Sequence, residues 1–287
     1  MSRGFIALIM ITRPNNVALT ALSVIVGGIC AFAPFGGELA IAAVSASLIA
    51  AGGYVLNDVF DIEIDRINRP ERPLPRGDIG KTTAVIWAAL LVAFGTVLSL
   101  LLSPANVAVA VIAAVSLVLY AAWLKRTLLV GNLVVAAVSG LTFLYGGFVG
   151  PAAYMALVPA VLASLFHLGR EFFKAAADRV GDSAVGANTI AVKYGEDFTV
   201  RVATIPLFIV ISVSTLPYFW SWFGIRYLIV VVVAVDAVLL GVIVFAWRNP
   251  NLSMAGRLAR VLKWDMLAGL IALGYDRWAT WISTPSW

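Results

Sequence analysis

Stretches of about 20 mostly apolar residues recur along the chain, separated by short polar connections. An α-helix needs about that length to cross the hydrocarbon core of a bilayer. We therefore predict an all-α, polytopic membrane protein whose transmembrane helices form a bundle around a central cavity. The pattern gives nine such helices, at 15–34, 38–56, 82–102, 105–123, 129–149, 152–173, 199–220, 226–247 and 259–282.

The basic residues favour one orientation of this bundle. If the N-terminus is cytoplasmic, 18 of the 20 Lys and Arg residues fall on the cytoplasmic side, and Arg226 and Arg277 lie outside. Short cytoplasmic loops of membrane proteins carry such an excess of Lys and Arg. We therefore expect a cell-membrane protein with a cytoplasmic N-terminus and, because nine is odd, a C-terminus on the outside.

The longest polar segments follow the second and sixth predicted helices, four helices apart. This spacing suggests a parallel repeat of a four-helix unit. We expect residues 1–287 to form one transmembrane domain, in which helices 1–4 and helices 5–8 are the two halves and a ninth helix is added. Both long polar segments face the predicted cytoplasmic side, so the cavity is expected to open there.

Composition agrees with a membrane protein and limits the partners. The chain is 62% hydrophobic and 12% charged, with a mean hydropathy of +0.98, far from the averages of soluble domains. The net charge of +5 does not imply nucleic acid, because basic cytoplasmic loops already account for it. Cys30 is the single cysteine of the sequence, which excludes an intramolecular disulfide and a cysteine-based metal cluster.

An acidic motif, NDVFDIEID, begins at the end of the second predicted helix. If the helix continues, Asn57, Asp58, Asp61 and Asp65 fall within an arc of about 100° on one face. Crowded carboxylates favour a cation, and Mg²⁺ takes oxygen ligands from carboxylates and substrate phosphates. The motif therefore predicts a Mg²⁺-diphosphate site, whereas an ordinary charged loop would scatter its acids among its bases.

Basic residues that could contact a diphosphate lie in two predicted cytoplasmic connections. Arg66 and Arg72 follow the acidic motif on a proline-broken loop, and Lys125 and Arg126 connect the fourth and fifth predicted helices. Guanidinium groups match the geometry of phosphate oxygens. The positive-inside rule alone would also place basic residues here, so the diphosphate contact of Lys125 and Arg126 stays one of two interpretations.

A second polar stripe runs along the end of the sixth predicted helix, at His167, Glu171, Lys174, Asp178 and Asp182. Its last two members repeat the carboxylate pair of the first motif at the equivalent place in the other half. Two acidic helix ends could thus face each other across one cavity. The lone histidine favours a packing or supporting role over metal binding. An acid also lies in the apolar run of the eighth predicted helix, at Asp236, where a charge should mark a cavity or a partner.

Taken together, NDVFDIEID, DRINRPERPLPRG, YAAWLKRTLLVGN and DRVGD followed by GANT resemble the motifs of the UbiA-type intramembrane prenyltransferase superfamily. The resemblance covers nearly the whole chain. It implies transfer of a prenyl group from a prenyl diphosphate to a lipophilic acceptor, with two Mg²⁺ ions held between the acidic motifs. Carried over by position, the Mg²⁺-diphosphate ligands would be Asn57, Asp61, Asp65, Asp178 and Asp182, with Asp58 adjacent.

Within that resemblance, Asp61, Asp65 and Asp182 are the expected catalytic carboxylates, and Arg72 or Lys125 would help the diphosphate leave. The resulting allylic cation must be shielded from water, and aromatic faces could steady it. The candidates are Tyr120, Phe143 and Tyr145.

The opening TRPNN and the REFFK and DRVGD segments are most similar to the archaeal branch that prenylates geranylgeranylglyceryl phosphate in ether-lipid synthesis. That branch often carries further acids where this chain has Ala175, Ala176 and Ala177. The expected donor is geranylgeranyl diphosphate. An aromatic acceptor of the 4-hydroxybenzoate type is the alternative. A secondary transporter of an anionic metabolite is less favoured, because transporters bind near the membrane midplane.

Overall fold

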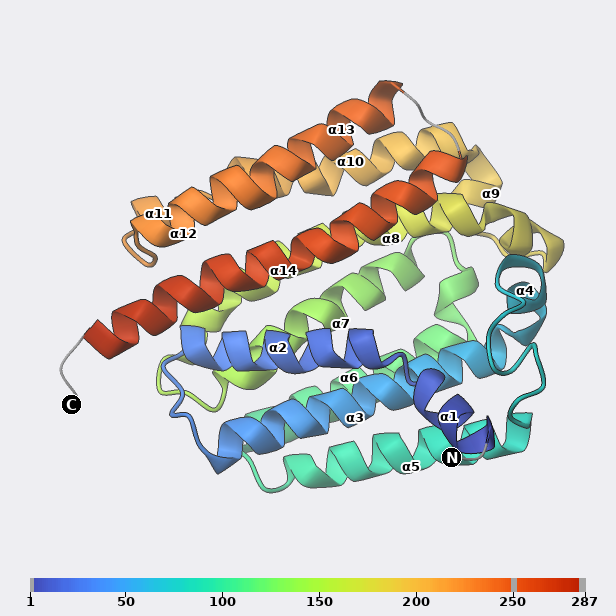
Figure 1. Cartoon of the computed structure of the whole chain (residues 1–287), viewed down its shortest axis with the longest axis horizontal. Helices are drawn as coiled ribbons and strands as arrows, with labels where there is room; N and C mark the ends of the chain where they lie inside the picture. Colours follow the sequence, from blue (N-terminus) through green and yellow to red (C-terminus); the bar gives the residue numbers. More distant parts are fainter. Residues whose placement is uncertain (1–2, 249–251, 284–287) are drawn as a thin grey trace.

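A computed structural model describes residues 3–248 and 252–283, and these ranges contain helices and no strand. The helices run in chain order through one bundle (Figure 1). Their bounds are α1 Arg3–Met10, α2 Pro14–Cys30, α3 Gly37–Phe60, α4 Ile62–Asn68, α5 Lys81–Ser99, α6 Pro104–Ala122, η1 Leu124–Arg126, α7 Val130–Gly147, η2 Ala153–Ala156, α8 Leu157–Ala184, α9 Ile190–Tyr194, α10 Glu196–Val213, α11 Leu216–Phe219, α12 Ile225–Val230, η3 Val231–Asp236, α13 Ala237–Arg248 and α14 Leu252–Ser283.

The N-terminal half is built on α3, which packs against α2, α5 and α6. Glycines let α3 and α5 approach closely: a Cβ atom on Gly52 would lie 2.8 Å from the Ala88 carbonyl, and one on Gly95 would lie 2.8 Å from that of Ser45. Small residues serve helix packing in membranes in this way. The hydroxyl of Ser45 also donates to the Gly95 carbonyl at 2.7 Å, which fixes the pair.

The long helix α8 joins the two halves, since it packs against α7 on one side and against α10 and α14 on the other. Figure 1 shows α14 running along the bundle beside α8, and α14 also contacts α2. Its far end is fixed by Asp276, which accepts hydrogen bonds from the backbone N–H groups of Gly224 at 2.8 Å and Tyr227 at 3.3 Å at the start of α12. The bundle is therefore closed around α8 by the last helix.

Every predicted apolar stretch coincides with a helix in the described part of the chain. Seven helical segments are long and apolar enough to cross a membrane, and the bent pair Gly4–Met10 and Pro14–Cys30 would make eight. The ninth predicted span falls on α14, which is not among them. That helix carries the charged residues Arg257, Arg260, Lys263, Asp265, Asp276 and Arg277. The structure thus confirms a helical bundle with seven or eight candidate spans, and the count of nine stays a prediction.

We had expected the acidic motif to continue the preceding helix, but it does not. α3 ends at Phe60, Asp61 takes a non-helical conformation with φ −99° and ψ 8°, and α4 then begins at Ile62. The Asp65 N–H still donates to the Asp61 carbonyl at 2.7 Å, so backbone hydrogen bonding resumes directly after the break.

Candidate active site

The two acidic motifs meet where α4 packs against the end of α8. The Arg69 guanidinium lies 3.0 Å from the Asp178 carboxylate, and a Cβ atom on Gly181 would overlap the side chain of Asn68. A glycine at position 181 therefore lets α4 rest directly on α8. The cavity between them has a volume of about 450 Å³, and its acidic lining consists of Asp61, Asp65, Glu171, Asp178 and Asp182.

One predicted metal ligand of the first motif does not line this cavity. Asp58 is buried, forms an ion pair with Arg13 and lies 3.1 Å from the Arg72 guanidinium. Asp58 nevertheless stays close to Asp65, because Arg72 Nη1 contacts both carboxylates, at 3.1 Å and 2.6 Å. Asp58 instead positions two arginines whose side chains do line the cavity.

A lysine occupies the centre of the first motif. The Lys125 ammonium lies 2.6 Å from Asp61 Oδ1, and it donates to the Asn57 carbonyl at 3.3 Å. The Asn57 side-chain amide donates in turn to Asp61 Oδ2 at 2.8 Å. Burial lowers the pKa of Lys125, while the nearby Asp61 carboxylate acts in the opposite direction. Gly131 makes this loop possible, since a Cβ there would lie 2.6 Å from the Leu124 carbonyl.

The third acid of the motif is held by an arginine. Arg72 Nη1 lies 2.6 Å from Asp65 Oδ2, and the Asp65 side chain is only 2% exposed. Burial raises the pKa of Asp65 to about 6, against the effect of Arg72, which lowers it. Asp65 therefore lies where an additional cation would favour its ionised form.

The four basic residues predicted to contact a diphosphate are placed differently. Arg72, Lys125 and Arg126 line the cavity. Arg66 lies outside it, with an exposed side chain paired to Glu63 at 2.9 Å on the same turn of α4. Sequence reasoning singled out Arg66 by its position after the motif, but only the helical register shows that it points away.

Several cavity residues carried no specific sequence assignment, among them Arg69 and Asn132. Arg69 pairs with Asp178 across the two motifs, and Asn132 lines the cavity. Asn132 belongs to the LKRTLLVGN segment, so its place in that motif was the available signal. For Arg69 the sequence offered only its place in the arginine-rich loop.

Four of the five members of the polar stripe of α8 line the cavity, and the fifth, His167, lies beyond it. Asp178 and Asp182 line it at its acidic end, where the Thr189 hydroxyl donates to Asp182 at 3.3 Å. Toward the centre of the bundle, buried Glu171 accepts from Lys174 at 2.8 Å and from Arg170 at 3.0 Å. One face of one helix therefore presents acids for a cation and bases for an anion.

The donor set fits a hard divalent cation, although the carboxylates already face cations of the chain. In the described ranges no three His, Cys, Asp or Glu side chains are gathered closely enough to hold a metal ion. Asp61, Asp65 and Asp178 instead face Lys125, Arg72 and Arg69. Carboxylate and amide oxygens around one cavity are what Mg²⁺ prefers. A metal would take over carboxylates whose basic partners could then turn to phosphate.

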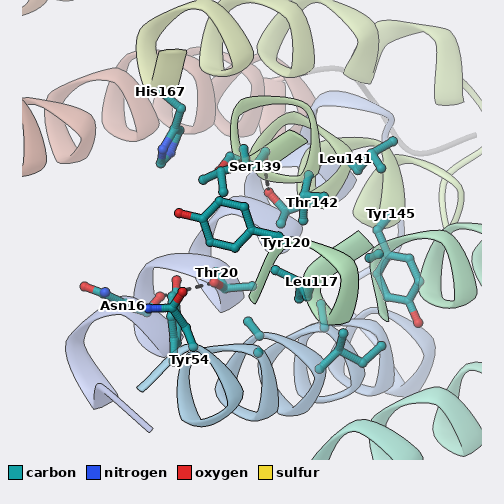
Figure 2. Close-up of a pocket in the computed structure, with 18 of the residues that line it drawn as sticks. Asn16, Thr20, Tyr54, Leu117, Tyr120, Ser139, Leu141, Thr142, Tyr145 and His167 are labelled. Atoms are coloured by element: carbon teal, nitrogen blue, oxygen red, sulfur yellow. Dashed lines mark hydrogen bonds between the residues drawn. The ribbon is translucent and has the colours of Figure 1, made fainter. Parts of the chain in front are cut away.

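A second, more apolar cavity of about 190 Å³ continues from this one into the membrane part of the bundle, between α2, α3, α6 and α7. Figure 2 shows Tyr120 projecting into it from α6, with Tyr54 and Asn16 on one side and His167 on the other. Tyr120 lines both cavities, so its ring lies at their junction. This is the position that a group able to steady a cation would need.

The other two aromatic candidates lie elsewhere. Tyr145 lines the apolar cavity, but its hydroxyl shares a 2.7 Å hydrogen bond with Ser45. Phe143 lines a separate cavity of about 80 Å³ next to α10, η3 and α14. Tyr120 alone of the three candidates borders the cavity that contains the acidic motifs.

The two isolated polar residues have structural surroundings that the sequence did not reveal. His167 lines both apolar cavities from α8. Asp236 lies on the π-helical turn η3 and accepts a hydrogen bond from the Ser214 hydroxyl at 2.8 Å. One carboxylate oxygen of Asp236 therefore has a partner, while the other, Oδ1, is buried without one in the described ranges.

Known proteins share this fold and sequence pattern. Residues 17–267 match the UbiA prenyltransferase family. A digeranylgeranylglyceryl phosphate synthase of Methanopyrus kandleri is 35% identical over 93% of this chain and 97% of its own length. A solved structure described as digeranylgeranylglyceryl phosphate synthase is 30% identical, covers 96% of this chain and 98% of its own, and has a TM-score of 0.77. A UbiA homologue from Archaeoglobus fulgidus bound to GPP and Mg²⁺ is 14% identical, with a TM-score of 0.64 over 93% of this chain and 99% of its own.

Proposed function

The chain belongs to the UbiA prenyltransferase family, and from that membership we propose that it transfers a geranylgeranyl group from geranylgeranyl diphosphate to geranylgeranylglyceryl phosphate. The product would be the digeranylgeranylglyceryl phosphate in the name of its relatives. The proposal rests most directly on one observation. Carboxylates and cations from both motifs line a single cavity that continues into an apolar cavity within the bundle.

The metal-binding residues are proposed to be the oxygen donors of the two motifs. They are Asn57, Asp61, Asp65, Asp178 and Asp182. When bound there, Mg²⁺ supplies charge neutralisation that makes the diphosphate a better leaving group. The donor set and the GPP and Mg²⁺ in the Archaeoglobus fulgidus structure support a divalent ion at this place.

The basic residues of the cavity are proposed to bind the diphosphate. Lys125 and Arg72 face carboxylates that metal ions would occupy, so both can turn to phosphate oxygens when those carboxylates are taken. Arg126 lines the same wall. Asp58 would position Arg13 and Arg72, with which it forms ion pairs.

The reaction then breaks the bond between C1 of the prenyl group and the diphosphate oxygen, and the electron pair leaves with the diphosphate. The acceptor hydroxyl oxygen forms the new ether bond to C1, and its proton passes to a carboxylate. Asp61, Asp65 and Asp182 are the proposed bases. Tyr120 borders the place where the allylic cation would form, and its ring face would steady it.

The chain is a multi-pass membrane protein, and the proposed site also predicts its orientation in the membrane. The cavity with both acidic motifs lies at the helix ends rich in Arg and Lys, which the positive-inside rule assigns to the cytoplasm. We propose a cytoplasmic N-terminus, nine spans that include α14, and two four-helix halves in one domain. Labelling of single cysteines introduced at Arg76 and Ser221 from either side of a membrane would test this orientation.

Detergent-solubilised protein with geranylgeranyl diphosphate and geranylgeranylglyceryl phosphate tests the activity itself. Pyrophosphate release and formation of the diether are expected with Mg²⁺, to stop with EDTA, and to return with excess Mg²⁺. Uptake of an anionic metabolite into proteoliposomes without pyrophosphate release would contradict the proposal and favour a transporter.

A further inference from the structure

We call the cavity of about 450 Å³ that both acidic motifs line the acidic cavity, and a further cavity adjoins it on the side of α14. A polar cavity of about 80 Å³ there shares Asn16, Arg170 and Lys263 with the acidic cavity. It shares Ser23, His167 and Met266 with the apolar cavity next to α10 and η3. This small cavity, which we call the side cavity, therefore joins the acidic cavity to the apolar cavity next to α10 and η3, and it also borders the apolar cavity of about 190 Å³, with which it shares Tyr54 and Thr142.

The side cavity carries an arginine with unused hydrogen-bonding capacity. Arg170 donates through Nη1 to Glu171 at 3.0 Å, and its side chain is 18% exposed. Its Nε atom is buried and has no hydrogen-bond partner within the described ranges. Buried donors without a partner are costly, so this one fits a ligand that accepts hydrogen bonds.

The second cation of the side cavity is Lys263, which is half-buried on α14 and has no ion pair or hydrogen bond to any residue that the structure describes. The surrounding charges do not balance. Glu171 pairs with Arg170 and Lys174, and within the described ranges Lys263 has no carboxylate partner, so three cations lie near one carboxylate. The excess of two positive charges matches a phosphate monoester, which carries close to two negative charges at neutral pH.

We propose that Arg170 and Lys263 bind the phosphate group of the acceptor, and that the acceptor's hydrocarbon chain enters the apolar cavity beyond the side cavity. This inference rests on the proposed function and extends it to acceptor recognition. The apolar cavity is lined by residues such as Phe166, Val231 and Leu270, which suit an isoprenoid chain. Donor and acceptor chains would thus leave the acidic cavity toward two different apolar cavities, both of which His167 lines.

The test compares wild type with Lys263→Gln and uses two acceptors that differ only in the phosphate, geranylgeranylglyceryl phosphate and geranylgeranylglycerol. Equilibrium binding of each is measured without the donor, and turnover is measured in parallel. Lys263→Gln is expected to weaken binding of the phosphate-bearing acceptor, and to raise its KM, by about 10- to 100-fold. Binding of geranylgeranylglycerol, kcat and the KM for geranylgeranyl diphosphate should stay unchanged.

Two further variants separate recognition from folding. Lys263→Arg should restore most of the phosphate preference, because a guanidinium also binds phosphate. Arg257→Gln, an exposed charge on the same helix outside the cavities, should behave as wild type. Equal binding of the two acceptors by wild type, or unchanged preference in Lys263→Gln, would overturn the inference. Phosphate-dependent binding without turnover would support this site while refuting the proposed reaction.

Discussion

The ammonium group of Lys125 lies 2.6 Å from Oδ1 of Asp61, inside the cavity that both acidic motifs line. A cation of the chain thus neutralises a carboxylate that we propose as a metal ligand. If Asp61 binds a metal ion as proposed, that ion would compete with Lys125, and a diphosphate would relieve the competition by giving Lys125 an alternative partner.

Replacing Lys125 with Met should separate these two roles. Mg²⁺ binding without diphosphate should strengthen, because the competing cation is gone. The KM for geranylgeranyl diphosphate should rise by about 10- to 100-fold, because a charged hydrogen bond to phosphate is lost. Mg²⁺ titration by thermal shift and steady-state kinetics measure the two effects. Lys193→Met, on the exposed face of α9, is the control; weaker Mg²⁺ binding in Lys125→Met would contradict the competition.

Asp61→Asn and Asp182→Asn remove one proposed metal ligand from each motif. Each should lower kcat by about 100-fold or more at fixed Mg²⁺, because the lost ligands act directly on the metal site. Pyrophosphate release is the readout, and the melting temperature shows whether the fold survives. Glu63→Gln lies in the same motif but is exposed and should keep full activity. Full activity in both Asn variants would refute the site.

Arg66, in the last turn of α4, and Arg69, which directly follows this helix, form a matched pair. Arg69→Gln should lower activity by about tenfold, because it frees Asp178 and loosens the contact between α4 and α8. Arg66→Gln should remain within about twofold of wild type, since an exposed i,i+3 pair contributes little. Steady-state assays of both variants decide the matter, and equal losses would show that Arg66 reaches the substrate after all.

Gly181→Ala tests the contact that brings the motifs together. The added methyl group would overlap the side-chain amide of Asn68, so that side chain or α4 must shift, at a cost of up to about 1–3 kcal/mol in stability. Activity should fall together with the stability. Gly241→Ala on α13 meets open space and should leave both activity and melting temperature unchanged or slightly raised. A wild-type melting temperature for Gly181→Ala would mean that α4 is not held by this contact.

Much of this architecture could be predicted because apolar stretches and charge bias are local properties of the sequence. They placed the helices, and the motifs indicated the family, which the comparisons confirm. The direction of individual side chains was less accessible. Asp58 pairs with Arg13 and Arg72 behind the cavity lining, and the register of α4 exposes Arg66.

Contacts between distant segments could not be predicted at all. The pairing of Arg69 with Asp178 joins residues 109 positions apart, and no periodicity connects them. Lys263 looked like one more positive-inside residue of the last helix, and only the packing of α14 against α8 brings it beside Arg170. Such pairs depend on tertiary packing.

The most direct test of the account is a competition assay in which the purified protein receives geranylgeranyl diphosphate, Mg²⁺ and equal amounts of geranylgeranylglyceryl phosphate and 4-hydroxybenzoate. The cationic side cavity and the relatives' activity predict prenylation of the glyceryl phosphate alone. Prenylation of 4-hydroxybenzoate instead would contradict the acceptor assignment, while leaving the family and its acidic motifs in place.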